Sequence, residues 1–389
     1  MQPEQGQPSF SAGSLLYFLM HFSEHALSEL RAAAPKLEEL SAVVGLDGFV
    51  DTIVRPVALR HGQGDDFEAI TTITEFGNRV LQAAGKSANI EFYPLMDKLG
   101  GNGPIMANAL MSHGVKMTYV GTLGDVNIHP VFQEFAERAA VVSVTDPATT
   151  TAVEFDDGKL MLGQMRSLDG MTFEALERKL GATGLRDLLG GADLISMVNW
   201  TMIPNMTEIL RKLVSDVLPH LTDRKRHFFF DLADPQKRSR DDLLKVLHVI
   251  STFGEFGAVT LGLNLREAQQ VHLALDFHVI GETKADLQQL SADIRGKLNY
   301  ATVVVHPKES AACATAEGTF WIPGPYVTKP LITTGAGDHF NAGFSLGQLL
   351  GLSPTTCLAL GCTTSGHYVR TAKSPTWADL ESFLANWPE

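Results

Sequence analysis

The sequence has few cysteines, no long apolar run and no strongly basic segment. Its 389 residues include only Cys313, Cys357 and Cys362, an odd number without C-x-x-C spacing. A disulfide framework and a cysteine-based zinc site are therefore not expected, and a reducing, cytoplasmic location is favoured. The apolar stretch at residues 15–22 is too short to span a membrane and lacks the basic start of a signal peptide.

The charge balance is acidic, with 31 Lys and Arg against 44 Asp and Glu and a formal net charge of −13. Nucleic-acid-binding proteins usually carry a basic stripe or net positive charge. The nearest basic runs, at residues 224–226 and 237–240, are short and flanked by polar residues. We therefore expect small-molecule substrates and neither a nucleic acid nor a membrane as partner.

Apolar strand-like runs alternate with helical patterns from residue 41 to the C-terminus. Six of these runs lack alternating polar residues, as strands covered on both faces do. They are residues 42–46, 117–120, 194–198, 227–231, 258–261 and 302–305. The pattern predicts a three-layer α/β/α domain over residues 41–389 with a mainly parallel sheet.

Residues 1–40 form a separate N-terminal segment in this prediction. Residues 14–40 show the pattern of one or two amphipathic helices. They could pack on the main domain or on a partner subunit, and the sequence leaves both open.

Three segments break the pattern with alternating apolar and polar residues, at 53–59, 90–98 and 150–162. The last contains Asp156-Asp157-Gly158-Lys159, a hairpin turn signal. We expect a small, separate sheet that is exposed on one face. Because no linker divides the chain, this sheet would be an inserted lid over a site on the main sheet.

The most informative segment is T-T-G-A-G-D at residues 333–338, directly before a helical, apolar stretch. Small residues at a helix start expose backbone amides at the positive end of the helix dipole, which favours phosphate binding. Gly335 and Gly337 let a phosphate approach the backbone. The Asp338 carboxylate could accept a proton from an alcohol held there. An ordinary loop with a helix cap is the alternative for so short a motif.

This segment resembles the C-terminal signature D-T-x-G-A-G-D of ribokinase-like (PfkB) carbohydrate kinases, and the likeness extends over residues 42–375. The resemblance implies a ribokinase-like fold and transfer of a phosphoryl group from ATP to a hydroxyl of a small sugar. It assigns Asp338 as general base, the amides of Gly335, Ala336, Gly337 and Asp338 as anion hole, and Thr333 and Thr334 as nucleotide contacts. Ile332 replaces the first Asp, which in relatives helps to hold a monovalent cation.

Two N-terminal segments resemble the sugar-binding part of the same family. Asp51 best matches the carboxylate that grips sugar hydroxyls, and Asp47 is a second candidate. Gly100, Gly101 and Asn102 resemble the di-glycine motif against which the sugar lies. The alternatives are a surface position for Asp51 and plain turns for Asp47 and the glycines.

Asn264 and Glu267 match an N-x-x-E motif that, in relatives, organises Mg²⁺ and its waters near the phosphates. A capping box at a helix start explains the same spacing, and both interpretations can hold together. Lys308 lies where relatives have a nucleotide-binding loop and could meet a phosphate or lie exposed. Asp231 follows a strand at the sheet's carboxyl edge and could touch substrate or the metal's waters. Residues 237–238 could compensate phosphate charge.

Two other functions remain open from the sequence, a nucleoside kinase of the same superfamily and a non-catalytic sugar sensor. The sensor is kept open because Ile105, Pro307 and Ile332 depart from the family pattern. The resemblance also allows a homodimer, since relatives often pair through their lids.

Overall fold

The structure, a computed structural model, describes residues 12–221 and 224–388, with side chains from Phe22 onward. Its centre is a nine-stranded sheet in the order β14-β13-β12-β11-β10-β9-β1-β5-β6. Neighbours from β12 to β6 pair in parallel, and β13 and β14 pair antiparallel at one edge. The strands are β1 (Ser41–Gly45), β5 (Lys116–Gly121), β6 (Ala140–Ser143), β9 (Leu194–Met197), β10 (His227–Asp231), β11 (Ala258–Leu263), β12 (Thr302–Val305), β13 (Ser310–Thr315) and β14 (Gly318–Pro323).

Helices cover both faces of this sheet, and each face has its own apolar core. Alternate residues of β1 divide between the two cores, Val43 facing one and Val44 the other, as the strand period of two requires. The first layer holds α5 (Phe173–Gly190), α6 (Met206–Lys212), α7 (Arg240–Thr252), α8 (Leu265–Ala274) and α9 (Lys284–Leu298); the second holds α1 (Ala12–Ala33), α3 (Asn102–His113), α4 (Gln133–Arg138), α10 (Ala336–Leu350), α11 (Pro354–Thr371) and α12 (Trp377–Ala385). The predicted three-layer fold is confirmed.

No helix among the described residues combines the length and apolarity needed to cross a bilayer.

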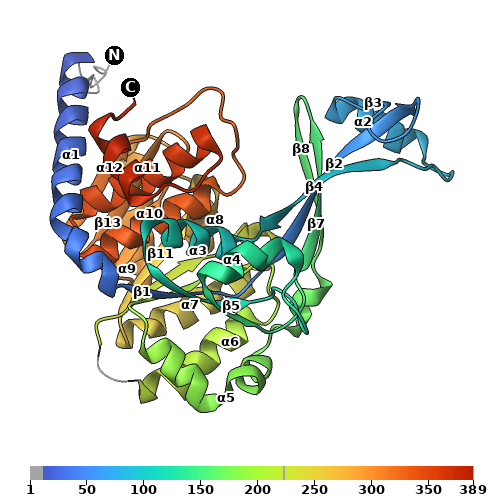
Figure 1. Ribbon diagram of the computed structural model, residues 1–389. Coiled ribbons are helices and arrows are strands. Elements are labelled where there is room, and N and C mark those ends of the chain that lie inside the picture. Colours follow the sequence, from blue (N-terminus) through green and yellow to red (C-terminus); the bar gives the residue numbers. More distant parts are fainter. Residues whose placement is uncertain (1–11, 222–223, 389) are drawn as a thin grey trace.

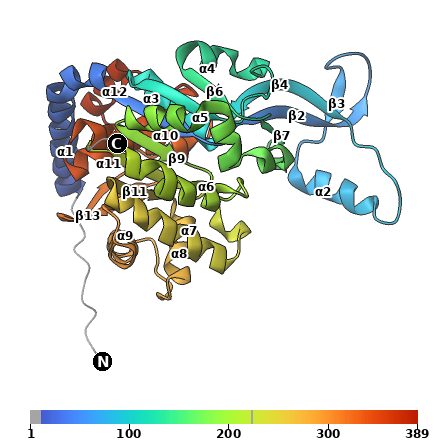
Figure 2. The same ribbon diagram turned by 90° about the horizontal axis from the view of Figure 1, so that it is seen from below.

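A second sheet of five strands projects from one side of the main domain (Figures 1 and 2). β2 pairs with β3, β4 and β7, and β7 pairs with β8. Its elements are β2 (Phe49–Arg60), β3 (Phe67–Ala69), α2 (Ile73–Gln82), β4 (Phe92–Gly100), β7 (Ala148–Phe155) and β8 (Gly158–Gln164). The three alternating segments of the sequence lie within these strands. We call this unit the small sheet.

The helix α1 packs along the main domain against α11 and α12 (Figure 1). Its side chains Ala26 and Leu30 are wholly buried. Glu29 accepts hydrogen bonds from the Ser353 amide (3.1 Å) and hydroxyl (2.9 Å) at the start of α11. Of the two placements that the sequence left open, the structure has the N-terminal helix on its own chain.

Candidate active site

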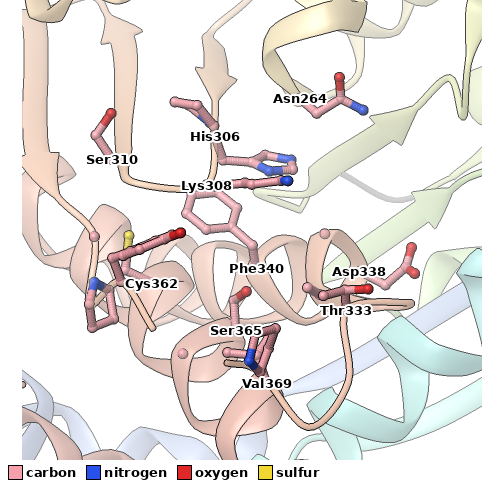
Figure 3. A pocket seen from close by; sticks show the side chains of 18 of the residues that line it. Asn264, His306, Lys308, Ser310, Thr333, Asp338, Phe340, Cys362, Ser365 and Val369 are labelled. Carbon is pink, nitrogen blue, oxygen red and sulfur yellow. The ribbon is translucent and has the colours of Figure 1, made fainter. Parts of the chain in front are cut away.

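Two adjoining cavities lie at the carboxyl edge of the main sheet. The first, of about 560 Å³, lies over the ends of β10, β11 and β12 and the start of α10 (Figure 3). The second, of about 830 Å³, lies between the small sheet and the loop at residues 330–334. Pro330 and Thr333 line both, so the cavities meet at the loop before α10. This edge is where open α/β sheets bind ligands.

The start of α10 presents unpaired backbone amides. Gly335 is the N-cap, with φ 87°, a conformation that favours glycine. The Ala336 amide donates to the Thr333 carbonyl at 3.2 Å. Among the described residues, the amides of Gly335, Gly337 and Asp338 donate to no backbone group. Free amides at the start of a 15-residue helix make an anion site, although the Ala336 amide is occupied in this conformation.

The carboxyl group of Asp338 lines the first cavity and is nearly buried (Figure 3). Its Oδ1 accepts a 2.8 Å hydrogen bond from Nδ2 of Asn102. Burial raises the pKa of Asp338 well above its usual value, and the nearby Asp231 carboxylate raises it further, while the Asn102 hydrogen bond lowers it. The group can accept a proton once nearby positive charge favours its ionised form.

Asp47 is wholly buried and lines neither cavity. Its carboxylate accepts hydrogen bonds from the amides of Asn102 (2.9 Å) and Gly103 (2.8 Å) and from Nδ2 of Asn199 (2.6 Å). Burial raises the pKa of Asp47 to about 6, against the effect of these bonds. The residue therefore holds the start of α3, and the structure gives it no place as a sugar contact.

Asp51, by contrast, lines the second cavity from β2. Lys98 lies directly opposite it on β4, and Lys159 lines the same cavity from β8. Burial raises the pKa of Asp51, while a hydrogen bond with Thr150 and the two lysines lower it. A Cβ at Gly100 would collide with the Asp51 carboxylate, so a larger residue there would displace that side chain. Carboxylate and ammonium groups together can bind neighbouring hydroxyls.

The N-x-x-E residues form a complete capping box at the start of α8. Glu267 accepts from the amides of Asn264 (3.0 Å) and Asp234 (2.9 Å), and Asn264 Oδ1 accepts from the Glu267 amide (3.0 Å). Both side chains also line the first cavity. Asp231, beside them, has its pKa raised to about 8 by burial and by Glu267. Asn264 and Glu267 thus cap α8, and their position in the cavity also allows them to help hold a metal ion.

The donor set of the first cavity suits a hydrated Mg²⁺ ion. Asp231, Glu267 and Asp338 line it, and Lys308 is the only lysine or arginine among the described residues that does. No group of three His, Cys, Asp or Glu in the described chain is placed to hold a metal directly. Mg²⁺ commonly keeps several waters and binds through few carboxylates plus phosphate oxygens, so these residues fit it.

The far wall of the first cavity is apolar. The His306 ring stacks on Phe340 with centroids 4.5 Å apart, and Lys308 is exposed at the rim (Figure 3). The apolar lining includes Pro307, Pro325, Val327, Phe340, Cys362 and Val369. An apolar wall with polar groups at one end suits a flat ring that carries phosphates.

The two basic residues expected to compensate phosphate charge lie elsewhere. Arg238 lies over the Trp200 ring at 4.8 Å and donates to the Ile203 carbonyl at 2.7 Å. Lys237 pairs with Asp234 at 3.4 Å. Neither lines a cavity, because the turn at Asp234 (φ 63°) and the following proline carry them away. That prediction is wrong.

Sequence reasoning missed Lys98, Asn199, His339 and Tyr368, all of which contact the site. Lys98 had a usable signal, since it lies four residues before Asn102 in a predicted strand. Asn199 follows β9 with φ 62°, and only the fold brings it to Asp47. His339 and Tyr368 contact the loop at residues 334–335 through ring orientations that no local pattern specifies.

Comparison with known proteins gives a consistent result. A family model described as prokaryotic ketohexokinase matches residues 22–387. The chain is similar to a ketohexokinase from Haloferax volcanii, with 29% identity over 345 residues that cover 88% of this chain and 90% of the relative.

Solved structures of low identity show the same fold. A carbohydrate kinase from Agrobacterium tumefaciens has a TM-score of 0.61 at 14% identity, over 90% of this chain and 98% of that one. A ribokinase from Thermotoga maritima has a TM-score of 0.57 at 15% identity, over 89% and 98%. The fold is therefore ribokinase-like.

Proposed function

Because the chain belongs to the prokaryotic ketohexokinase family, we propose that it transfers the γ-phosphoryl group of ATP to a hydroxyl group of a ketohexose. The name of the Haloferax volcanii relative supports the ketohexose as acceptor. One observation carries the proposal. The Asp338 carboxyl group lies at the start of α10, beside free amides and next to the loop where the two cavities meet.

The nucleotide would occupy the first cavity, with its base against the apolar wall and its phosphates at the start of α10. The free amides of Gly335, Gly337 and Asp338 are preorganised donors for the charge on the transferred group. Asn264, Glu267 and Asp231 would hold Mg²⁺ through water. When bound, Mg²⁺ neutralises phosphate oxygens and favours ionised carboxylates around it.

The acceptor would occupy the second cavity, against the small sheet. Asp51 would accept hydrogen bonds from two neighbouring hydroxyls, and Lys98 would donate to a third oxygen. Gly100 and Gly101 line neither cavity, and their lack of a side chain lets the backbone pass close to the Asp51 and Asp47 carboxylates. Movement of the small sheet toward the main domain would exclude water, which otherwise competes as phosphoryl acceptor.

Asp338 would remove the proton from the attacking hydroxyl. Asn102 Nδ2 donates to its Oδ1 at 2.8 Å, so the carboxylate would keep one orientation while its second oxygen serves the acceptor. Phosphoryl transfer requires alignment and charge compensation more than covalent chemistry from the protein.

The direct test measures ADP formation from ATP and Mg²⁺ with fructose, other ketohexoses, aldohexoses, ribose and adenosine. We expect ketohexose-dependent turnover that Asp338→Asn removes. Preference for adenosine would replace the proposal with a nucleoside kinase. ATP binding without turnover on any acceptor would indicate a sugar sensor.

A further inference from the structure

Two stacked rings hold the loop that precedes α10 from the side of the second cavity. The His339 and Tyr368 rings lie with centroids 3.6 Å apart and an interplanar angle of 13°. The Tyr368 hydroxyl donates to the Thr334 carbonyl at 3.0 Å, and His339 Nδ1 lies 2.7 Å from the Gly335 carbonyl oxygen. The stacked pair therefore contacts both peptide units of Gly335.

Because each peptide unit is planar, a hydrogen bond that fixes its carbonyl also fixes the direction of its amide. The carbonyl of one residue and the amide of the next lie in one plane and point in opposite directions. Tyr368 thus fixes the amide of Gly335 through the Thr334 carbonyl. The Gly335 carbonyl accepts hydrogen bonds from both the His339 backbone amide (3.1 Å) and His339 Nδ1, and the two bonds together fix the amide of Ala336, which closes the turn onto Thr333 at 3.2 Å. Gly335, at φ 87°, lies between the two held peptide units.

The protonation states agree with this arrangement. A carbonyl oxygen only accepts, so His339 Nδ1 carries the proton of the bond to Gly335. Burial lowers the pKa of His339 to about 4, so the ring is neutral and its Nε2 accepts from the Ser374 hydroxyl at 2.9 Å. Asn108 Nδ2 in turn donates to Ser374 at 3.1 Å. Burial, with the Asp338 carboxylate, raises the pKa of Tyr368 to about 12, so its hydroxyl remains a donor.

We propose that His339 and Tyr368 are positioning residues that set the turn at Gly335 and thereby hold the free Gly335 amide and the first turn of α10 at the phosphate site. They act through the backbone and from the side opposite the nucleotide cavity. That the bound phosphate belongs to ATP rests on the proposed function. Both rings also line the second cavity, so a direct contact with the acceptor is the competing role that the test must separate.

Three variants separate these roles. Tyr368→Phe removes one hydroxyl and keeps the ring, and His339→Ala removes the Nδ1 donor. His339→Asn is the matched control, because its side-chain amide can donate from a similar position. Each is compared with wild type for binding of a non-hydrolysable ATP analogue with Mg²⁺, for adenosine binding, for kcat and for the acceptor KM.

We expect Tyr368→Phe and His339→Ala to weaken ATP-analogue binding by about 3- to 10-fold, the value of one hydrogen bond. Adenosine affinity and the acceptor KM should stay within about twofold, while kcat falls by about 10-fold or more through misplacement of the reacting groups. His339→Asn should recover most of the loss.

Equal weakening of adenosine and ATP-analogue binding would overturn the inference in favour of a general structural role. A raised acceptor KM with unchanged ATP-analogue binding would overturn it in favour of a sugar contact. Another outcome is that wild type phosphorylates no acceptor, while the variants still bind the ATP analogue more weakly and adenosine normally. In that case the proposed function fails and the positioning role stands.

Discussion

Nδ2 of Asn102 donates a hydrogen bond to Oδ1 of Asp338 across 236 positions of the chain. The bond joins the first residue of α3 to the first turn of α10, two of the helices that begin at the site. The Asp47 carboxylate in turn accepts a hydrogen bond from the backbone amide of Asn102 and so fixes the position of that residue. The Asp338 carboxyl group, the proposed general base, is thus oriented by Asn102, whose own position is set by the buried Asp47 carboxylate.

Replacing Asp338 with Asn should abolish most turnover and retain nucleotide binding. The carboxamide has the same shape but accepts no proton, and loss of a general base typically costs about 100- to 10,000-fold in kcat. The measurements are kcat and the ATP-analogue Kd. Asp125→Asn, at an exposed aspartate outside both cavities, is the matched control. A near-normal kcat for Asp338→Asn would remove this residue from the mechanism.

Replacing Asn102 with Ala should shift the pH dependence of the reaction. The Asn102 hydrogen bond lowers the pKa of Asp338 against the stronger effect of burial, so its loss raises that pKa. Because only the ionised carboxylate accepts a proton, the acidic limb of kcat/KM should move to higher pH. The measurement is the full pH profile of wild type and variant. A lowered rate with an unmoved limb would mean that Asn102 only orients the base.

The metal-free protein should lose stability as pH rises from about 4 to 8. The pKa of Asp47 is raised to about 6 and that of Asp231 to about 8, both by burial first, so the folded chain binds these protons more tightly than the unfolded chain does. Such stabilisation is complete below the unfolded pKa of about 3.9 and is lost as pH passes the folded values.

Urea unfolding at several pH values measures this effect. In Asp231→Asn, the loss of unfolding free energy between low pH and about pH 8 should be smaller by at least about 1 kcal/mol, since a shift of about one pKa unit corresponds to that energy. Asn341 Oδ1, which has no partner among the described residues, can accept from the new amide after rotation. A stability that rises over this pH range would contradict the expectation.

Asn264 offers a way to separate helix capping from a metal role. Asn264→Ala should lose about 1 kcal/mol of stability with the N-cap, whereas Asn264→Ser keeps a good cap. If Asn264 also helps to hold hydrated Mg²⁺, both variants should need more Mg²⁺ for half-maximal activity. The measurements are Tm and the Mg²⁺ dependence of kcat. A normal Mg²⁺ requirement in Asn264→Ser would limit the residue to capping.

The packing of α1 predicts that an N-terminal substitution weakens the whole domain. Leu30 is wholly buried against the second helix layer, and Leu30→Ala should cost about 2–5 kcal/mol through lost contacts and a cavity. Glu24→Ala, at an exposed site on the same helix, should change stability by at most about 0.5 kcal/mol. Equal Tm values for the two variants would show that α1 is dispensable for stability.

Six strands of the main sheet were predictable because they are short apolar runs buried on both faces, such as residues 302–305. Strand β6, with only four residues at the edge of the sheet, was not. The small sheet was predictable from its alternation. The β13–β14 hairpin was not, because residues 310–315 are rich in alanine and carry little strand signal. Helix α5 was missed as well, and its interior contains Gly181 with φ 71°.

The site was predictable where a local motif sets the geometry and unpredictable where tertiary contacts do. The spacing of Asn264 and Glu267 specifies a capping box that forms as expected. The sequence ranked Asp51 above Asp47 by resemblance alone, since both follow the same strand. Burial of Asp47 beneath α3, together with its bond from the distant Asn199, keeps Asp47 out of both cavities.

The small sheet joins the main domain through chain segments at the start of β2 and the end of β4, and these segments contain or adjoin site residues. β2 begins two residues after Asp47 and carries Asp51, and β4 ends at Gly100, next to the N-cap of α3. Larger side chains at Gly48 or Gly100 would collide with Thr122 or Asp51. Met96 and Met161, farther out, are exposed at the cavity rim. If the proposed acceptor site is correct, exchange of these rim side chains could change which sugar is accepted, whereas Gly48, packed against the Thr122 backbone, has no room for a larger residue.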